Sequence, residues 1–128
     1  MARFVTPAEA VSLVPDDATL GLVGGGGGLC EAMLLHEEIE KRFLETGHPR
    51  NLTVVHALGI GDRKNTGMNR FAHKGMVAAV IGGHWVWSPE MQRMAAETPR
   101  QIANAHTVFN IMNTLLFLGF VKPVARFV

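Results

Sequence analysis

The sequence has little cysteine and little net charge, and each shortage excludes a class of protein. One cysteine in 128 residues excludes an internal disulfide and favours a reducing, cytoplasmic location. A formal net charge of +1 leaves no basic footprint, so we expect no nucleic-acid partner. The six histidines show no paired metal-ligand spacing, so no metal site is expected. The N-terminus has no long apolar run, and we therefore expect no signal peptide there.

Glycine, by contrast, is concentrated in one place. A short apolar strand is predicted over 19–23, and it leads directly into five consecutive glycines, Gly24–Gly28. Glycine is costly to order, so such a run indicates a sharp turn or the close approach of a ligand. An amphipathic helix is predicted over 29–46, and the free N–H groups of its first turn would face the same space.

Neither of two common phosphate-binding patterns fits this loop. The dinucleotide fingerprint lacks its third glycine, because Leu29, Cys30 and Glu31 follow the run, and no Gly-Lys-Ser/Thr completes a P-loop. A purely structural turn or linker is the alternative interpretation, but a strand and an amphipathic helix, rather than polar filler, flank the run.

Two more predicted strands also end in glycine-containing loops. The strand over 52–56 precedes Gly59 and Gly61, and the strand over 76–81 precedes Gly82 and Gly83. Helical connections favour parallel pairing with right-handed crossovers, which brings all three loops to one edge of the sheet. Ligands of open α/β sheets bind at that edge. The sequence therefore predicts an α/β fold with an open, three-layer-type parallel sheet of at least three strands. The predicted ligand-binding residues are Gly24, Gly25, Gly26, Gly27, Gly28, Gly59, Gly61, Gly83 and His84.

Capping signals predict the remaining helices. Thr6 and Pro7 are typical of the start of a helix, here over 7–14, and Gly47 is placed to end the helix over 29–46. A short helix is expected over 69–74. Ser88 has the character of an N-cap for a final helix ending at about residue 97.

Several single residues are open to more than one interpretation. Cys30, at the predicted helix start, has no local base to activate it, and we interpret it as a buried structural thiol. His84 could contact a ligand or serve as a turn histidine. Asp62 is interpreted as a turn cap or as the partner of Arg63, with a ligand contact as the less favoured alternative. The tryptophans at 85 and 87 are expected to pack.

Taken together, the motifs resemble a known family. Over about residues 5–97 the chain is similar to the family I CoA-transferases, the closest likeness being to the acetate/propionate type. The motifs are Val23-Gly-Gly-Gly-Gly-Gly-Leu-Cys30, Pro49-Arg-Asn-Leu-Thr53, Gly59-Ile-Gly-Asp-Arg63, and Gly82-Gly-His-Trp85 with Ser88-Pro89. The resemblance implies a domain that moves CoA from an acyl-CoA to a carboxylic acid through a glutamyl-CoA thioester. It also implies that the glycine loop helps to hold the thioester, that CoA is a substrate rather than a bound cofactor, and that a homo-oligomer is possible.

The chain also departs from this family. The family's catalytic glutamate lies in the second half of a chain several times longer, and no residue here matches it. Glu31, Glu37, Glu38 and Glu40 are assigned to the first long helix, so no catalytic residue is identified. We therefore expect residues 1–98 to be a partial CoA-transferase domain that is inactive alone. A small α/β ligand-binding module is the alternative.

The segment 99–128 looks different from the rest. Ile102 to Val121 carries no charged side chain. Through the stretch Ala-Asn-Ala-His-Thr-Val-Phe-Asn at 103–110, the segment 100–128 is similar to a helix of sodium/phosphate cotransporter-type membrane proteins. A hydrophobic helix over 101–121 could associate with a membrane, with His106, Asn110 and Asn113 as a polar stripe. The alternatives are an amphipathic helix that covers the sheet, or a segment foreign to the domain through fusion or a shifted reading frame.

Overall fold

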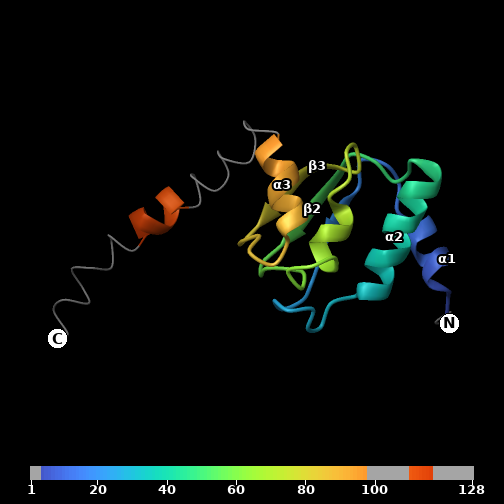
Figure 1. The fold of residues 1–128 in the computed structure, drawn as a ribbon, viewed down its shortest axis with the longest axis horizontal. Coiled ribbons are helices and arrows are strands. Elements are labelled where there is room, and N and C mark those ends of the chain that lie inside the picture. Colours follow the sequence, from blue (N-terminus) through green and yellow to red (C-terminus); the bar gives the residue numbers. More distant parts are fainter. Residues whose placement is uncertain (1–3, 98–109, 117–128) are drawn as a thin grey trace. The chain divides into compact units, whose positions relative to one another are not determined.

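The computed structural model describes residues 4–97 and 110–116, and the chain divides into two units, 1–97 and 98–128, which are described separately. In the first unit, helices and strands alternate along the chain (Figure 1). The elements are, in order, α1 (Pro7–Ser12), β1 (Thr19–Gly21), α2 (Met33–Thr46), β2 (Leu52–His56), the 3₁₀ helix η1 (Gly67–Phe71), β3 (Val77–Gly82) and α3 (Pro89–Glu97).

The three strands form one open sheet in the order β1-β2-β3, and both pairings are parallel. This confirms the predicted parallel α/β arrangement. The second strand has the predicted bounds, whereas β1 ends at Gly21 and β3 begins at Val77. Along β2 the side chains alternate, with Leu52 and Val54 fully buried and Thr53 partly exposed. One face of the sheet is therefore covered and the other meets solvent.

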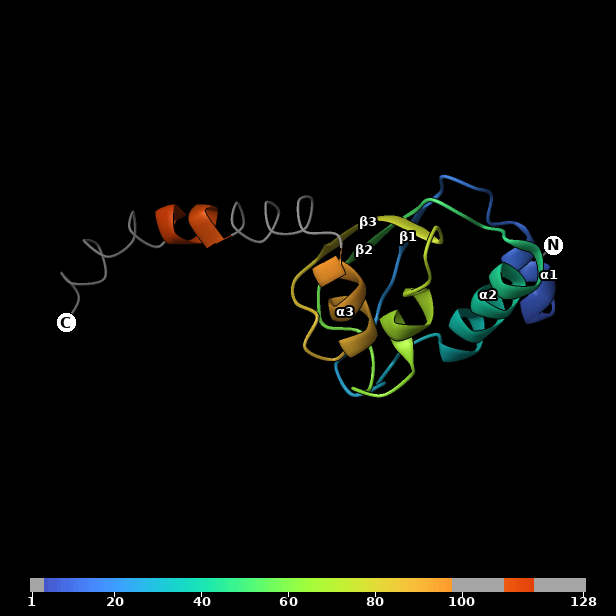
Figure 2. The same cartoon turned by 45° about the horizontal axis from the view of Figure 1, so that its top comes forward.

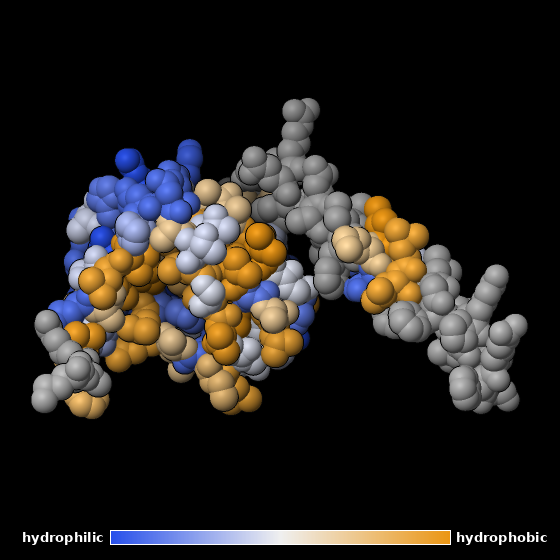
Figure 3. Space-filling model, turned by 180° about the vertical axis from the view of Figure 1, so that it is seen from behind, coloured by the Kyte–Doolittle hydropathy of each residue, from blue (hydrophilic) through white to orange (hydrophobic). Residues whose placement is uncertain are grey.

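The helices lie on the covered face, below the strands in Figure 2. The core beneath the sheet consists of Val11, Ile39, Leu52, Val54, Ile60, Met68, Phe71, Met76 and Met91. On the opposite face Thr19, Gly21, Ala79 and Ile81 are exposed. Apolar side chains gather on the side of the unit seen in Figure 3. The second helical layer that a three-layer arrangement requires is thus not found among residues 4–97.

The long helix α2 begins later than predicted. It starts at Met33 rather than at about Leu29, because Cys30 has a left-handed φ of 55°, which an α-helix cannot include. Residues 29–32 form a separate connection, so the glycine loop does not run straight into the helix. The other end agrees with prediction, since Gly47 closes the helix in the left-handed conformation.

The shorter helices follow their signals only in part. α1 has the predicted cap, with Thr6 and Glu9 forming a reciprocal capping box. The helix predicted over 69–74 is instead the 3₁₀ helix η1. α3 begins at Pro89, but the Ser88 hydroxyl donates to the carbonyl oxygen of Ile60 rather than capping the helix.

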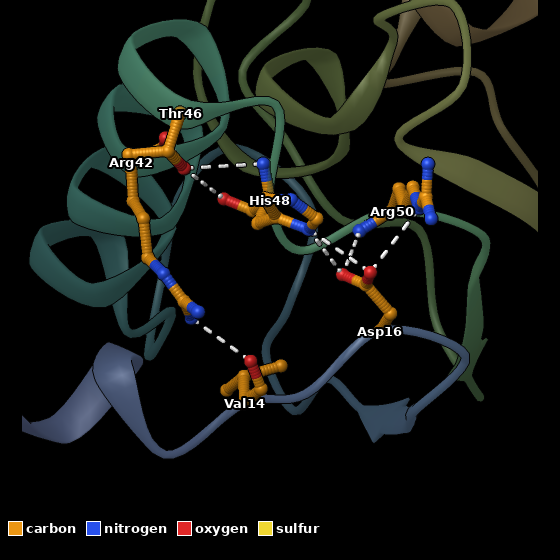
Figure 4. Close-up of polar contacts among 6 residues, drawn as sticks. All are labelled: Val14, Asp16, Arg42, Thr46, His48 and Arg50. Atoms are coloured by element: carbon orange, nitrogen blue, oxygen red, sulfur yellow. Dashed lines mark hydrogen bonds and ion pairs between the residues drawn. The ribbon is translucent and has the colours of Figure 1, made fainter.

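Polar contacts hold together the segments that lead into β1 and β2 (Figure 4). The Asp16 carboxylate accepts hydrogen bonds from His48 Nδ1 at 2.9 Å and from the Arg50 N–H at 3.0 Å. These bonds, that of His48 first, lower the pKa of the Asp16 carboxyl. Arg42 of α2 donates to the carbonyl oxygen of Val14 at 2.8 Å. The parallel pairing of the two strands is therefore supported at their start, the edge opposite the glycine loop.

In the second unit, the structure describes a helix over 110–116. Four of its side chains are exposed and apolar, namely Ile111, Met112, Leu115 and Leu116. Most of the hydrophobic helix predicted over 101–121 lies outside the described residues, including His106. Across residues 4–97 and 110–116, no helix combines the length and the apolar character needed to cross a membrane.

Candidate functional site

Three loops meet at the carboxyl edge of the sheet. The first loop (22–32) follows β1 and contains the glycine loop Gly24–Gly28, the second loop (57–66) follows β2, and the third loop (83–88) follows β3. The N–H of Gly27 donates to the carbonyl oxygen of Gly61 at 2.9 Å, which joins the first loop to the second. The N–H of Arg63 donates to the carbonyl oxygen of Trp87 at 2.9 Å, which joins the second loop to the third. The edge at which parallel α/β sheets bind ligands is therefore built from backbone segments in direct contact.

The glycine loop is a compact turn with alternating free amides. The N–H of Gly25 donates to the carbonyl oxygen of Leu29 at 2.8 Å, and Gly27 is engaged with the second loop. Gly27 and Gly28 have φ angles of 89° and 82°, which residues other than glycine rarely adopt. The N–H groups of Gly26 and Gly28 find no acceptor within residues 4–97. They are the donors that this loop can offer to a ligand.

The glycines of the second loop, which the sequence predicts as ligand-binding residues, are closely approached by the third loop. Gly59 and Gly61 are buried, and a Cβ at Gly59 would collide with the His84 and Trp87 rings. A Cβ at Gly61 would lie 2.5 Å from the carbonyl oxygen of Trp87. These two glycines let the third loop pack closely onto the second. Their ligand-binding role stays a prediction.

The remaining predicted site residues lie on the outside of the edge. Gly83 and His84 are exposed, and a Cβ at Gly83 would meet the backbone carbonyl oxygen of Ala57. In the glycine loop, Gly27 is exposed, and its neighbours are partly so. A Cβ at Gly26 would run into the indole of Trp87, so this tryptophan covers the middle of the loop.

Arg63 places a positive charge at this edge. Its guanidinium carbon lies 4.3 Å from the centre of the Trp87 ring, a cation–π arrangement. Asp62 does not pair with Arg63, because its Oδ1 accepts the N–H groups of Lys64, Asn65 and Thr66. Of the two interpretations of Asp62, the turn cap is confirmed.

Two of the sequence interpretations in this region are wrong. Cys30 is exposed rather than buried, because it lies in the connection ahead of α2 and not in the first turn of the helix. Glu31 lies in the same connection and so is not a helix residue. Its Oε1 accepts the N–H of Gly61 at 2.8 Å.

Burial affects the protonation of His56, the histidine at the carboxyl end of β2. His56, the last residue of β2, is buried, and its Nδ1 donates to the carbonyl oxygen of Leu58 at 2.6 Å. Burial lowers the pKa of His56, because a charged ring would lose its hydration, and the nearby His84 adds to this effect. The ring is therefore neutral at neutral pH. In the described part of the chain, no cluster of His, Cys, Asp and Glu could hold a metal ion.

Three residues that matter here were missed by the sequence reasoning. Glu31 connects two loops, Trp87 covers the glycine loop, and Asn69 connects η1 to the third loop. All three act over long sequence separations, and no local pattern signals such contacts. The one available signal is the run of glycines, because residues without side chains leave space that side chains from elsewhere in the chain can fill.

In sequence and in fold, this chain is similar to CoA-transferases. About 70% of the chain is homologous to proteins of that class, although no protein-family model matches it. One relative is acetate CoA-transferase YdiF of Escherichia coli K12, which is 38% identical over 89 residues. A caffeate CoA-transferase of Acetobacterium woodii is 38% identical over 85 residues, or 66% of this chain.

Solved structures of YdiF from E. coli O157:H7 agree with this homology. A thioester complex with CoA superposes with a TM-score of 0.70 at 36% identity, covering 73% of this chain. The apoenzyme superposes with a TM-score of 0.71. The chain spans only 17% of the length of YdiF and 16% of the caffeate enzyme. The resemblance predicted from the motifs is thus confirmed as homology over part of a CoA-transferase.

Proposed function

We propose that residues 1–98 are a partial CoA-transferase domain whose glycine loop holds the thioester carbonyl oxygen of an acyl-CoA. The homologous YdiF has a structure as a thioester complex with CoA, and the homology extends over 89 residues of this chain. A short-chain carboxylic acid would be the acceptor in a complete enzyme. CoA is then a substrate and not a resident cofactor.

One observation supports this assignment more than any other. The amides of Gly26 and Gly28 lack acceptors within residues 4–97, whereas those of Gly25 and Gly27 are engaged. Backbone N–H groups aimed at a carbonyl oxygen stabilise the negative charge that develops there during acyl transfer. A run of glycines is needed because side chains would prevent so close an approach.

The predicted site residues would divide into two groups. Gly24–Gly28, Gly83 and His84 would face the acyl-CoA, since they are wholly or partly exposed. Gly59 and Gly61 would contribute from behind, by allowing the third loop to pack against the second. Arg63, above Trp87, would attract the negatively charged groups of CoA.

Loop substitution tests the binding proposal with the full chain and isothermal calorimetry. Gly25→Ala adds a methyl group whose nearest contact is the Leu29 carbonyl oxygen at 3.8 Å, so the fold should tolerate it. We expect CoA and acetyl-CoA to bind about tenfold more weakly, because the methyl group obstructs the approach to the loop. Gly21→Ala is the matched control, since a Cβ there meets nothing within 4 Å. Equal affinities for the two variants would contradict the proposal.

The same proposal predicts that this chain has no transferase activity alone. Glu31 lies at this edge, but its Oε1 already accepts a backbone N–H. Without a thioester-forming carboxylate, no covalent CoA adduct can form. Incubation with acetyl-CoA followed by hydroxylamine or borohydride should therefore detect no glutamyl thioester. A trapped adduct on any glutamate would overturn this part.

A small ligand-binding module for other anions is the competing proposal, and Arg63 is the observation that favours it. The guanidinium is exposed and is held by the indole beneath it. Competition separates the two proposals, because a module for simple anions would bind inorganic phosphate or acetate as tightly as acetyl-CoA. Tighter binding of acetyl-CoA would favour the CoA-transferase assignment.

A further inference from the structure

The side chain of Glu31 crosses from the glycine loop to the second loop. It belongs to the connection between the loop and α2, and its Oε1 accepts the N–H of Gly61 at 2.8 Å. The carbonyl oxygen of the same Gly61 accepts the N–H of Gly27 at 2.9 Å. The backbone N–H and the backbone carbonyl oxygen of Gly61 are thus both hydrogen-bonded to the first loop, the N–H through the carboxylate of Glu31.

Glycines make the space that this carboxylate occupies. A Cβ at Gly24 would lie 2.5 Å from Cγ of Glu31, and a Cβ at Gly67 would lie 2.7 Å from its Oε2. A Cβ at Gly67 would also lie 2.5 Å from the backbone nitrogen of Gly61. The side chain of Glu31 therefore lies against the backbone of Gly24, Gly61 and Gly67, where a larger residue would collide with it or with the neighbouring backbone.

The fit has an energetic cost. Oε2 of Glu31 is buried and has no hydrogen-bond partner among the described residues. An unpaired buried oxygen, and a charged one above all, destabilises a fold. A side chain selected only to stabilise this region would avoid that cost, so the geometry that Glu31 imposes on the loop is the better explanation for its presence.

We propose that Glu31 is a positioning residue that holds the glycine loop against the second loop and so sets the direction of the free Gly26 and Gly28 amides. The consequence for ligand binding rests on the proposed function. The positioning itself does not, because it concerns the contact between two backbone loops.

The test measures amide hydrogen exchange by NMR on the full chain, residue by residue. In Glu31→Ala, exchange at Gly27 and Gly61 should accelerate by at least about tenfold, the effect of losing one hydrogen bond to a charged group. Val54, fully buried in the central strand, should exchange at the wild-type rate. Glu45→Ala, a change at an exposed position of α2, is the control and should alter none of these rates.

Conservative variants separate positioning from general stability. Glu31→Gln keeps the length of the side chain and the Oε1 acceptor, so exchange at Gly27 and Gly61 should stay within about threefold of wild type. Glu31→Asp is one methylene shorter, cannot reach Gly61 and should resemble the alanine variant. Affinity for acetyl-CoA should follow the same order.

The outcomes are distinct for the two proposals. Unchanged exchange at Gly27 and Gly61 in Glu31→Ala overturns the positioning role. Equal acceleration at Val54 overturns it as well, since the effect would then be global. A wild-type chain that binds no acetyl-CoA contradicts the proposed function, while the exchange rates still decide the role of Glu31.

Discussion

Removing the side chain of Asn69 should weaken the support of the whole candidate site. This side chain is buried, and its Nδ2 donates to the carbonyl oxygens of Thr66 at 2.9 Å and of Trp87 at 3.4 Å. Its Oδ1 accepts the N–H of Glu90 at 3.1 Å, so it caps α3 from a distant part of the chain. One residue of η1 therefore holds the second loop, the third loop and the start of α3 together.

The magnitude follows from what each partner loses in Asn69→Ala. The Glu90 N–H loses its acceptor, which costs about 1 kcal/mol by analogy with other helix caps. Thr66 and Trp87 each keep another backbone donor to their carbonyl oxygens, so the two lost bonds cost only about 0.5–1 kcal/mol apiece. We expect the free energy of unfolding to fall by about 2–3 kcal/mol, a large share of the stability of a small domain.

Urea unfolding followed by tryptophan fluorescence measures this change. Trp85 and Trp87 both lie in the third loop, so the signal reports on the part of the site that Asn69 supports. Asn65→Ala is the matched control, since that side chain is exposed and should change stability by no more than about 0.5 kcal/mol. If Asn69→Ala unfolds at the same urea concentration as the control, the capping argument is wrong.

Two further predictions follow from the same edge. Gly26→Ala should displace the indole of Trp87, because the new methyl group would occupy its position, and the tryptophan emission should shift toward that of exposed indole; an unchanged spectrum would contradict the contact. Lowering the pH below about 6.5 should destabilise the chain, since burial lowers the pKa of His56 and the unfolded state then binds more protons than the folded state. His56→Gln should make the loss of stability with falling pH shallower, and an unchanged dependence in urea titrations between pH 7.5 and 5.5 would refute this.

The sequence predicts the sheet well because local patterns determine it. Each strand is a short apolar run between turn residues, and the connections are helical or long, so parallel pairing follows from general rules. The conjunction of three glycine-containing loops at one edge follows from the same rules. None of these inferences requires knowledge of which side chains touch.

The errors arise where a single residue or a distant partner decides the structure. The late start of α2 depends on the left-handed conformation of Cys30, which a pattern of apolar residues does not reveal. Ser88 is a residue type that often caps helices, but its hydroxyl donates to the carbonyl oxygen of Ile60 in the second loop. The side chain of Asn69 caps the helix instead. The burial of Gly59 and Gly61 could not be foreseen either, because a glycine in the sequence does not indicate whether a ligand or a tryptophan approaches it.

The sheet has one uncovered face, and this exposed apolar surface makes the proposed division of the chain at residue 98 testable. Parallel sheets are normally covered on both faces, yet Ala79 and Ile81 are exposed here. The helix over 110–116 also exposes apolar side chains, among them Met112 at 66%. We propose that residues 99–128 are a segment foreign to the partial domain, and association with a membrane through 101–121 stays a separate hypothesis.

Deleting residues 99–128 distinguishes these interpretations of the segment. If the segment is foreign, the truncated chain should keep its unfolding midpoint in urea and give smaller particles by light scattering, because one of two apolar surfaces able to self-associate has been removed. Ile111→Lys together with Leu115→Lys in the full chain is the control, since it removes the apolar surface without shortening the chain. Both changes should reduce particle size alike. A truncated chain that aggregates or unfolds at lower urea would show that the segment stabilises the domain, and the proposed division at residue 98 would then be wrong.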